Sequence, residues 1–250
     1  MEIRKMHPAR GWTWIKQGSQ LILRKPLQAI SLALTAALIL FFALRLPAIG
    51  PLVAVLFMPL LMTGYMRVCR ALEEDEEVVL IQLFAGFQQH TARLISLGGL
   101  FLLGLLLASM LMMLVGGEPL SKLLEAYQSN SNPQLLMDAM LASGSGVSLS
   151  LMLGFALVCL LMMAVQYAPM LVYFNEITPL AALRASLSGS LRNLIPYTVY
   201  SLLIQFIGIA LSIVPFGIGL IVLLPLGLTS LYVSYRNIFP LEDELTPSTP

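Results

Sequence analysis

The side chains that most often carry chemistry are few in this 250-residue chain and widely separated. Its two histidines, His7 and His90, occur in neither an HExxH nor an HxxxH spacing, the arrangements that place two zinc ligands on one helix face. The sequence also has no glycine-rich phosphate loop, no CxxC pair and no G-x-S-x-G nucleophile motif. We therefore predict no catalytic residues, no metal site and no cofactor.

A membrane enzyme is an alternative that a few residues leave open. His90 and Glu176 both lie on predicted cytoplasmic links, where they could act on a lipid together with neighbouring arginines. The apolar stretches described below contain no Asp, Glu, Lys or His, and proton- or ion-coupled transport usually needs such groups. The sequence therefore argues against a pump or an antiporter.

The elements that must position these residues are membrane spans. The chain is 58% hydrophobic and only 11% charged, whereas soluble domains contain about 25% charged residues. A soluble fold of this size has no room to bury so much apolar surface, so we expect lipid to be its solvent. The net charge of +1 gives no pull toward nucleic acid, and we expect no nucleic acid partner.

Six apolar stretches are long enough to cross a hydrocarbon core of about 30 Å as helices. They are residues 27–46, 49–68, 94–115, 147–174, 194–214 and 216–235. Links of only a few residues join the first two and the last two stretches, which predicts antiparallel hairpins there. The predicted fold class is all-α: a polytopic membrane bundle of six transmembrane helices in one domain over 1–250, with a disordered C-terminal tail at 239–250.

Lysine and arginine are distributed unevenly between the two sides that these spans define. Twelve fall on the side of the N-terminus, and two fall on the other. The twelve are Arg4, Lys5, Arg10, Lys16, Arg24, Lys25, Arg67, Arg70, Arg93, Arg184, Arg192 and Arg236; the two are Arg45 and Lys122. Positive residues near span ends mark the cytoplasmic side, so we predict a bacterial inner-membrane protein with both termini in the cytoplasm.

The order of landmarks along the chain indicates three copies of one unit, at about 11–72, 78–175 and 176–238. Each unit has an amphipathic segment, an entrance arginine, an apolar helix, a turn and a second helix that contains proline. The entrance arginines are Arg24, Arg93 and Arg192, and the prolines are Pro59, Pro169 and Pro225. Units of two spans keep one orientation, so these would be parallel hairpin repeats. The alternative is that any two membrane hairpins look alike.

Three prolines and two glutamines are the candidates for lining a path through such a bundle. Proline removes a backbone hydrogen bond, so Pro59, Pro169 and Pro225 are predicted helix breaks that either line a cavity or only kink their helices. Gln166 and Gln205 are the polar residues most costly to leave unpaired in lipid. We expect them to bond neighbouring helices, with a lipid or solute path as the alternative.

We predict an amphipathic interfacial helix on the cytoplasmic leaflet before each hairpin. Before the first hairpin, a polar stripe at helical spacing is formed by Thr13, Lys16, Gln17, Gln20 and Arg24. Trp12 and Trp14 lie off this stripe, and tryptophan prefers the headgroup level. The basic residues of these entrances are candidate lipid-headgroup contacts: Lys16, Arg24, Lys25, Arg93, Arg184 and Arg192. Anchoring is the simpler interpretation and binding of anionic lipid the alternative. The acidic run 73–77 should be a solvated face, with a bound cation or basic partner as the alternative.

Two short motifs resemble sequences of a known kind. The segment 178–193, TPLAALRASLSGSLRN, resembles the Ala-Leu-x-x-Ser…Asn stretch that precedes a span in uncharacterised proteobacterial inner-membrane proteins. The opening GWTWI with the later RKP at 24–26 resembles the start of such proteins. They are similar in architecture to the membrane domain attached to some glycerophosphodiester phosphodiesterases. The resemblance implies architecture and not activity, because this chain carries no phosphodiesterase catalytic domain.

Together these observations favour a non-enzymatic scaffold or accessory subunit of the inner membrane. The alternative is a lipid- or small-solute-handling transporter with a path between the hairpin repeats. Expected partners are membrane lipids, including anionic ones, and a membrane or periplasmic protein. The sequence leaves the oligomeric state open.

Overall fold

The computed structural model of the protein describes residues 3–128, 145–213 and 218–240. Every regular element within these ranges is helical, and six of the helices are long and apolar enough to cross a membrane. This confirms the predicted all-α fold class and its six candidate spans. Contacts divide the chain into unit 1, Met1–Gly99 with Met163–Pro250, and unit 2, Leu100–Met162.

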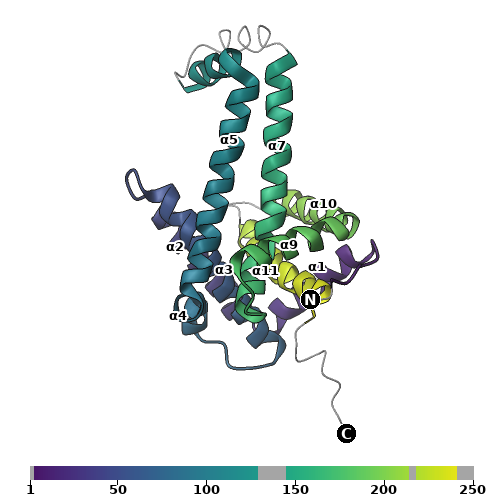
Figure 1. Ribbon diagram of the computed structural model, residues 1–250. Coiled ribbons are helices and arrows are strands. Elements are labelled where there is room, and N and C mark those ends of the chain that lie inside the picture. Colours follow the sequence, from purple (N-terminus) through teal and green to yellow (C-terminus); the bar gives the residue numbers. More distant parts are fainter. Residues whose placement is uncertain (1–2, 129–144, 214–217, 241–250) are drawn as a thin grey trace. The chain divides into compact units, whose positions relative to one another are not determined.

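The six candidate spans follow the predicted stretches (Figure 1). They are α2 (Pro26–Leu44), α3 (Gly50–Glu73), α5 (Thr91–Gln128), α7 (Ser145–Gln166) with α8 (Ala168–Phe174), α10 (Leu194–Ser212) and α11 (Ile218–Ile238). The shorter elements are α1 (Arg10–Arg24), η1 (Leu80–Phe84), α4 (Ala85–Gln88) and α9 (Pro179–Arg192). The predicted link between α10 and α11 lies outside the described residues.

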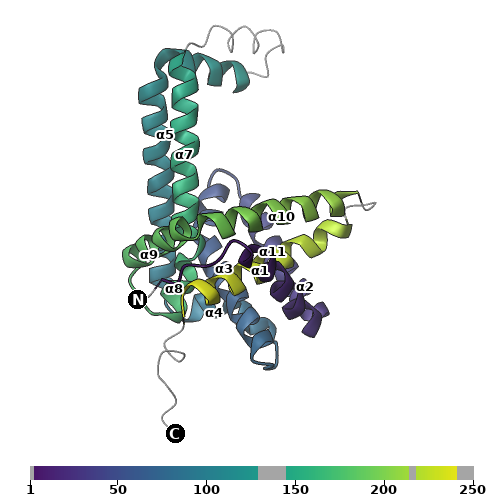
Figure 2. The ribbon, with the colours of Figure 1, turned by 90° about the vertical axis from the view of Figure 1, so that its right-hand side faces the viewer.

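Helix α1 packs against α10 and α11, which are the last two helices of the chain (Figures 1 and 2). Trp14 is fully buried, and its ring meets that of Tyr200 edge-on at 6.2 Å. Gly18 faces α11 so closely that a Cβ there would lie 2.6 Å from the Ser230 Oγ. Trp14 therefore belongs to the core and not to the headgroup level, because two neighbouring helices cover it, whereas Trp12 is 54% exposed.

Pro59 and Pro225 lie inside helices that continue past them, so neither proline breaks its helix. In both helices the threonine four residues later donates to the proline carbonyl. The Thr63 Oγ1 lies 2.8 Å from the Pro59 oxygen, and the Thr229 Oγ1 lies 2.9 Å from the Pro225 oxygen. Both threonines are buried, and this bond satisfies their hydroxyl groups without a second helix.

The predicted break at Pro169 does occur, between α7 and α8. In a continuous helix the Tyr167 N–H would donate to the Met163 carbonyl. Instead it donates to the Ser186 Oγ at 3.1 Å, and the Ser186 Oγ donates to the Met163 oxygen at 2.8 Å. Ser190 also donates to that oxygen. A serine from α9 has thus inserted into the hydrogen-bond ladder, a known cause of a sharp helix break.

Unit 2 is a helical hairpin made by α5 from Leu100 and α7 to Met162, which lie side by side in both ribbon views (Figures 1 and 2). Gly154 faces Met112 with no room for a Cβ, and the Ser150 Oγ donates to the Met112 carbonyl at 2.6 Å. Small residues at a helix crossing allow such close approach in membranes. At its far end α5 bends at Gly117, whose φ of 55° suits glycine, just before Pro119.

Large apolar side chains cover much of the outer surface of both units. In unit 2 the exposed ones include Leu103, Leu106, Leu107, Met110, Leu114, Met152 and Phe155. In unit 1 they include Phe42, Ile195, Phe206 and Ile209. Soluble monomers rarely expose apolar patches of this extent, whereas a lipid-facing surface requires them.

The packed chain extends slightly farther than the tail boundary predicted at residue 239. Phe239 is fully buried, and its ring packs against the rings of Tyr167 and Tyr235. Pro240 is buried too. An aromatic side chain next to a helix end gains free energy from burial, so hydropathy alone placed the boundary too early. Residues 241–250 lie outside the described part.

Candidate functional site

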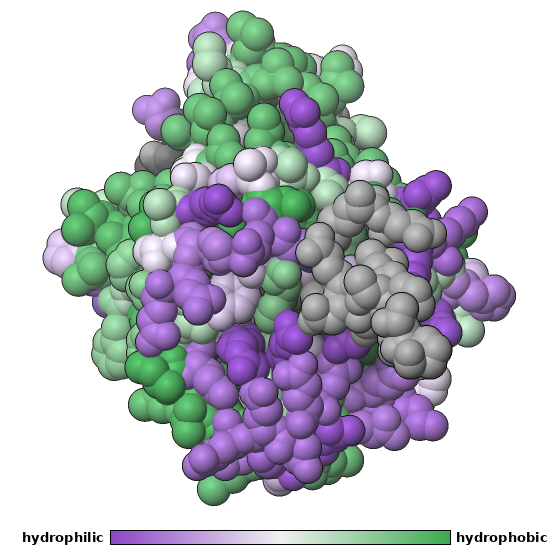
Figure 3. Space-filling view, turned by 60° about the horizontal axis from the view of Figure 1, so that its bottom comes forward, coloured by the Kyte–Doolittle hydropathy of each residue, from purple (hydrophilic) through white to green (hydrophobic). Residues whose placement is uncertain are grey.

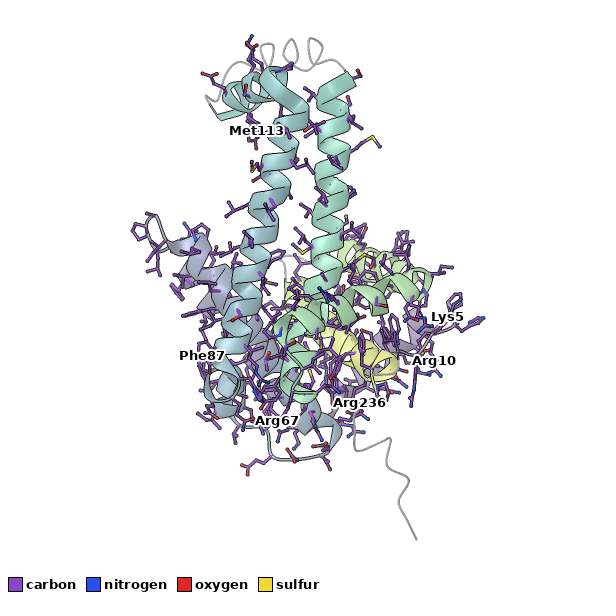
Figure 4. All side chains as sticks on the ribbon, viewed as in Figure 1. Lys5, Arg10, Arg67, Phe87, Met113 and Arg236 are labelled. Atoms are coloured by element: carbon purple, nitrogen blue, oxygen red, sulfur yellow. The ribbon has the colours of Figure 1, made fainter. Side chains whose placement is uncertain are left out.

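A polar cleft of about 500 Å³ opens in unit 1 beside α1 and the C-terminal part of α11. We call it the arginine cleft. Its lining residues are Arg4, Met6, Arg10, Gln17, Gln20, Leu21, Arg24, Glu73, Val233, Arg236 and Asn237. Figure 4 labels Arg10 and Arg236, which lie at one end of unit 1. In the view of Figure 3, hydrophilic residues gather in a broad patch with apolar residues at its margins.

Helix α1 supplies one wall of the cleft through a stripe of long polar side chains. Arg10, Gln17 and Arg24 follow one another at intervals of seven residues, which is close to two helical turns, so they lie on one face. All three are exposed, whereas the opposite face of α1 is buried against α10 and α11. The amphipathic pattern of the segment thus turns Arg10 and Arg24 toward the cleft.

The N-terminal segment, residues 3–9, supplies a second wall and is held there by Asn193. The Asn193 Oδ1 accepts a hydrogen bond from the Met6 N–H at 2.7 Å, and its Nδ2 donates to the Arg4 oxygen at 3.0 Å. The Arg4 N–H in turn donates to the Ile238 oxygen at the end of α11. We call this segment the strap. Asn193 is fully buried, so the strap is attached by bonds sheltered from water.

The end of α3 supplies the third wall. The Arg24 guanidinium donates to the Leu72 and Glu73 carbonyls at 3.0 and 2.9 Å, where a helix end leaves carbonyls unsatisfied. The Glu73 Oε2 accepts from the Tyr232 hydroxyl at 2.7 Å and from Arg236 at 2.5 Å. Glu73 therefore joins α3 to α11 through two side chains of α11.

The balance of charge in the cleft is positive. Among the described residues, four arginines line it and Glu73 is the one carboxylate. Because Glu73 is paired with Arg236, its charge is not available to compensate Arg4, Arg10 and Arg24. The side chains of Arg4 and Arg10 form no ion pair or hydrogen bond with any residue in the described ranges. Such a cleft attracts anions, and arginine favours phosphate and carboxylate oxygens.

The acidic run 73–77 proves to be more than a solvated face. Besides the Glu73–Arg236 pair, Glu74 pairs with Arg70 at 2.8 Å and Glu76 with Arg67 at 2.8 Å. Three of its five carboxylates therefore bind arginines of the same chain. The pair of Glu73 with Arg236 gave no signal in the sequence because the two residues are 163 positions apart, whereas the i, i+4 spacing of Arg70 and Glu74 is visible there.

The six predicted headgroup contacts fall into two classes. Four of them donate to backbone carbonyls: Arg24 as above, Lys25 to Glu76, Arg93 to Glu176 and Arg192 to Ile3. The side chains of Lys16 and Arg184 are exposed and form no hydrogen bond or ion pair with any described residue. Only Arg24 lines the arginine cleft. The other three cleft arginines are Arg4, Arg10 and Arg236, which were not among the predicted headgroup contacts.

The predicted path-lining residues do not line this cleft. Pro59, Pro169 and Pro225 are buried within unit 1, and none lines the arginine cleft. Gln166 lies next to the α7–α8 break and is half-buried, whereas Gln205 is exposed on α10 among apolar residues. Their part in a path through the bundle stays a prediction.

The structure does bring His90 and Glu176 together, as the enzyme alternative required. The His90 Nε2 lies 3.8 Å from the Glu176 Oε1, and both residues have positive φ, 56° and 53°. Each stands in a link next to a helix end, where a left-handed residue is common. Within the described ranges no three His, Cys, Asp or Glu side chains are grouped closely enough to hold a metal ion.

One comparison places the chain among known proteins. It is 26% identical to a probable inner membrane protein of Burkholderia thailandensis over 274 aligned residues, which cover 100% of this chain and 98% of that protein. No family model matches the chain, and no solved structure matches it. Together with its six membrane-capable helices, this likeness identifies the chain as an integral, multi-pass protein of the bacterial inner membrane.

Proposed function

We propose that the protein is a non-enzymatic scaffold of the inner membrane that holds an anionic lipid headgroup in the arginine cleft. The main support is that three arginines line one open cleft in which the one carboxylate among the described residues is already paired with a fourth arginine. Basic pockets between membrane helices on the cytoplasmic side bind anionic headgroups. A bound lipid would join α1, α3, α11 and the strap, which is a structural role and needs no reacting group.

The cytoplasmic location of the cleft and of both termini is part of this proposal. It is supported by the bias of twelve basic residues against two. The cleft arginines all belong to the twelve, so the cleft would face the inner leaflet, where anionic lipids attract basic side chains. A membrane or periplasmic protein partner remains compatible with the scaffold role.

The threefold hairpin repeat is a proposal with support from two sets of contacts. The Thr63–Pro59 and Thr229–Pro225 bonds occur at positions offset by the same 166 residues. The entrance arginines also behave alike. Arg24 and Arg93 each donate to a carbonyl at or just after the end of the second helix of their own hairpin repeat. Arg192 donates to Ile3, next to the strap residue that bonds the end of α11.

A lipid- or small-solute-handling transporter is the second candidate function. The specific observation in its favour is the serine-bridged break between α7 and α8, where the backbone has exchanged a helix bond for bonds to Ser186. Broken helices in membranes are tolerated where they are buried in protein or line a water-filled cavity. A transporter would move the lipid that enters the cleft, whereas a scaffold would only hold it.

Thermal unfolding of the full-length protein in a mild neutral detergent tests the proposed function. A ligand that binds only the folded state raises the melting temperature with its concentration. We expect added phosphatidylglycerol, but not zwitterionic phosphatidylethanolamine, to stabilise the wild-type protein. The variant Arg10→Gln should lose most of this stabilisation, and the matched control Arg45→Gln, which removes an arginine from the predicted opposite side, should keep it. Equal stabilisation by both lipids would refute the proposal.

A further inference from the structure

Resting on the proposed function, we infer that the headgroup in the arginine cleft carries two phosphate groups joined by a polar linker, as in a cardiolipin-type lipid. The inference comes from how the cleft arginines are spaced along α1 and how large the cleft is. A single phosphate group would leave part of this lining without a ligand.

The spacing of the basic residues is the first argument. Arg10 and Arg24 are fourteen residues apart on one face of α1, which separates their Cα atoms by about 21 Å along the helix axis. One phosphate group could bridge the two guanidinium groups only if both side chains extended fully toward each other, and the Arg24 guanidinium is instead held at the end of α3. A second phosphate on a short linker extends the reach of the ligand by several ångström, so that each phosphate needs to contact only one arginine.

The residue between the two arginines suits the linker. Gln17 lies midway on the same face and Gln20 beside it, and both line the cleft. A side-chain amide offers two donors and an acceptor, which matches a hydroxyl group better than it matches a phosphate. Along α1 the stripe therefore runs arginine, glutamine, arginine. The proposed headgroup runs phosphate, hydroxyl-bearing linker, phosphate in the matching order.

Charge and volume agree with this assignment. Arg4, Arg10 and Arg24 carry three positive charges that the carboxylate of Glu73, paired with Arg236, does not compensate. A phosphodiester headgroup with one phosphate brings a single negative charge, whereas two phosphates bring at least two. The cleft of about 500 Å³ falls within the range that holds a whole small molecule, and Leu21 and Val233 give it a minor apolar part.

Native mass spectrometry of the detergent-solubilised full-length protein tests the inference. The probes are cardiolipin, phosphatidylglycerol at twice the molar concentration so that total phosphate is equal, phosphatidylethanolamine, and inorganic pyrophosphate. We expect cardiolipin to bind at least about tenfold more tightly than phosphatidylglycerol, because linked groups bind the second site intramolecularly. Arg10→Gln should reduce this preference to near unity, whereas Arg45→Gln should leave it unchanged.

Arg24 needs a milder variant because it also bonds the end of α3. Arg24→Lys keeps the charge and a donor for the α3 carbonyls but removes the guanidinium fork, and it should lower cardiolipin affinity; the melting temperature in the absence of lipid measures separately what the contact with α3 has lost. Equal affinity for cardiolipin and phosphatidylglycerol would overturn the two-phosphate assignment and leave the proposed function standing. Preference for neither lipid over phosphatidylethanolamine would overturn both. Displacement of cardiolipin by pyrophosphate at similar concentration would overturn the linker assignment, because pyrophosphate has no linker, and would identify a soluble diphosphate as the ligand.

Discussion

Asn193→Ala should release the strap while leaving the helices in place. The side chain makes two hydrogen bonds with the strap, to the Met6 N–H at 2.7 Å and to the Arg4 oxygen at 3.0 Å. Each buried bond contributes about 0.5–1.5 kcal/mol net, so their joint loss costs about 2 kcal/mol of strap attachment. Since 1.4 kcal/mol is a factor of ten, the detached strap should become roughly 30-fold more populated.

Hydrogen exchange followed by mass spectrometry on the detergent-solubilised protein measures this population directly. The Met6 amide should exchange roughly 30-fold faster in Asn193→Ala, because local detachment of the strap limits its exchange. Asn237→Ala is the matched control, since Asn237 donates only within α11, to the Val233 oxygen. Unchanged exchange at Met6 in Asn193→Ala would show that Asn193 does not hold the strap. Equally accelerated exchange at Met6 in Asn237→Ala would show that the effect is not specific to Asn193, and it would refute the reasoning.

Three further predictions concern the bundle. Ser186→Ala should destabilise the protein by about 1–3 kcal/mol, because it removes both bonds at the α7–α8 break; the exposed Ser188→Ala should change the melting temperature little. Gly64→Ala should abolish normal folding, because a Cβ there would overlap the Leu83 carbonyl, whereas Gly99→Ala meets no atom within 4 Å and should be tolerated; yield of monodisperse protein separates the two. A C-terminal fusion should be fluorescent with green fluorescent protein and inactive with alkaline phosphatase, and an active phosphatase would reverse the predicted orientation.

The spans were predictable because hydropathy is a property of windows about as long as the helices themselves. The stretch predicted at 194–214 is helix α10, Leu194–Ser212, and the one at 49–68 begins within a residue of α3, Gly50–Glu73. Their polar ends were harder to predict. Helix α3 continues to Glu73 because Arg24 bonds a carbonyl of its last turn and Glu74 pairs with Arg70. Hydropathy averaged over a window does not detect such polar contacts.

The arginine cleft could be predicted only in part. The seven-residue spacing of Arg10, Gln17 and Arg24 is visible in the sequence and was the available signal for its α1 wall. Asn193 gave no comparable signal, because it looks like any polar residue after a helix, and its bond to Met6 spans 187 residues. Trp14 was misplaced for the same reason, since only the packing of α1 against α10 and α11 separates a core tryptophan from an interfacial one.

The packing of the first helix against the last two sets an order for biosynthesis. At 5–20 residues per second, α11 is completed roughly 10–40 s after the ribosome has finished α1. Through most of that interval Trp14 has no partner helix, and the strap has no Asn193 to bind. On the predicted orientation, the basic stripe of α1 would meet the anionic inner leaflet before the cleft exists, and lipid gathered there at that stage would already be present when the last hairpin packs beside it.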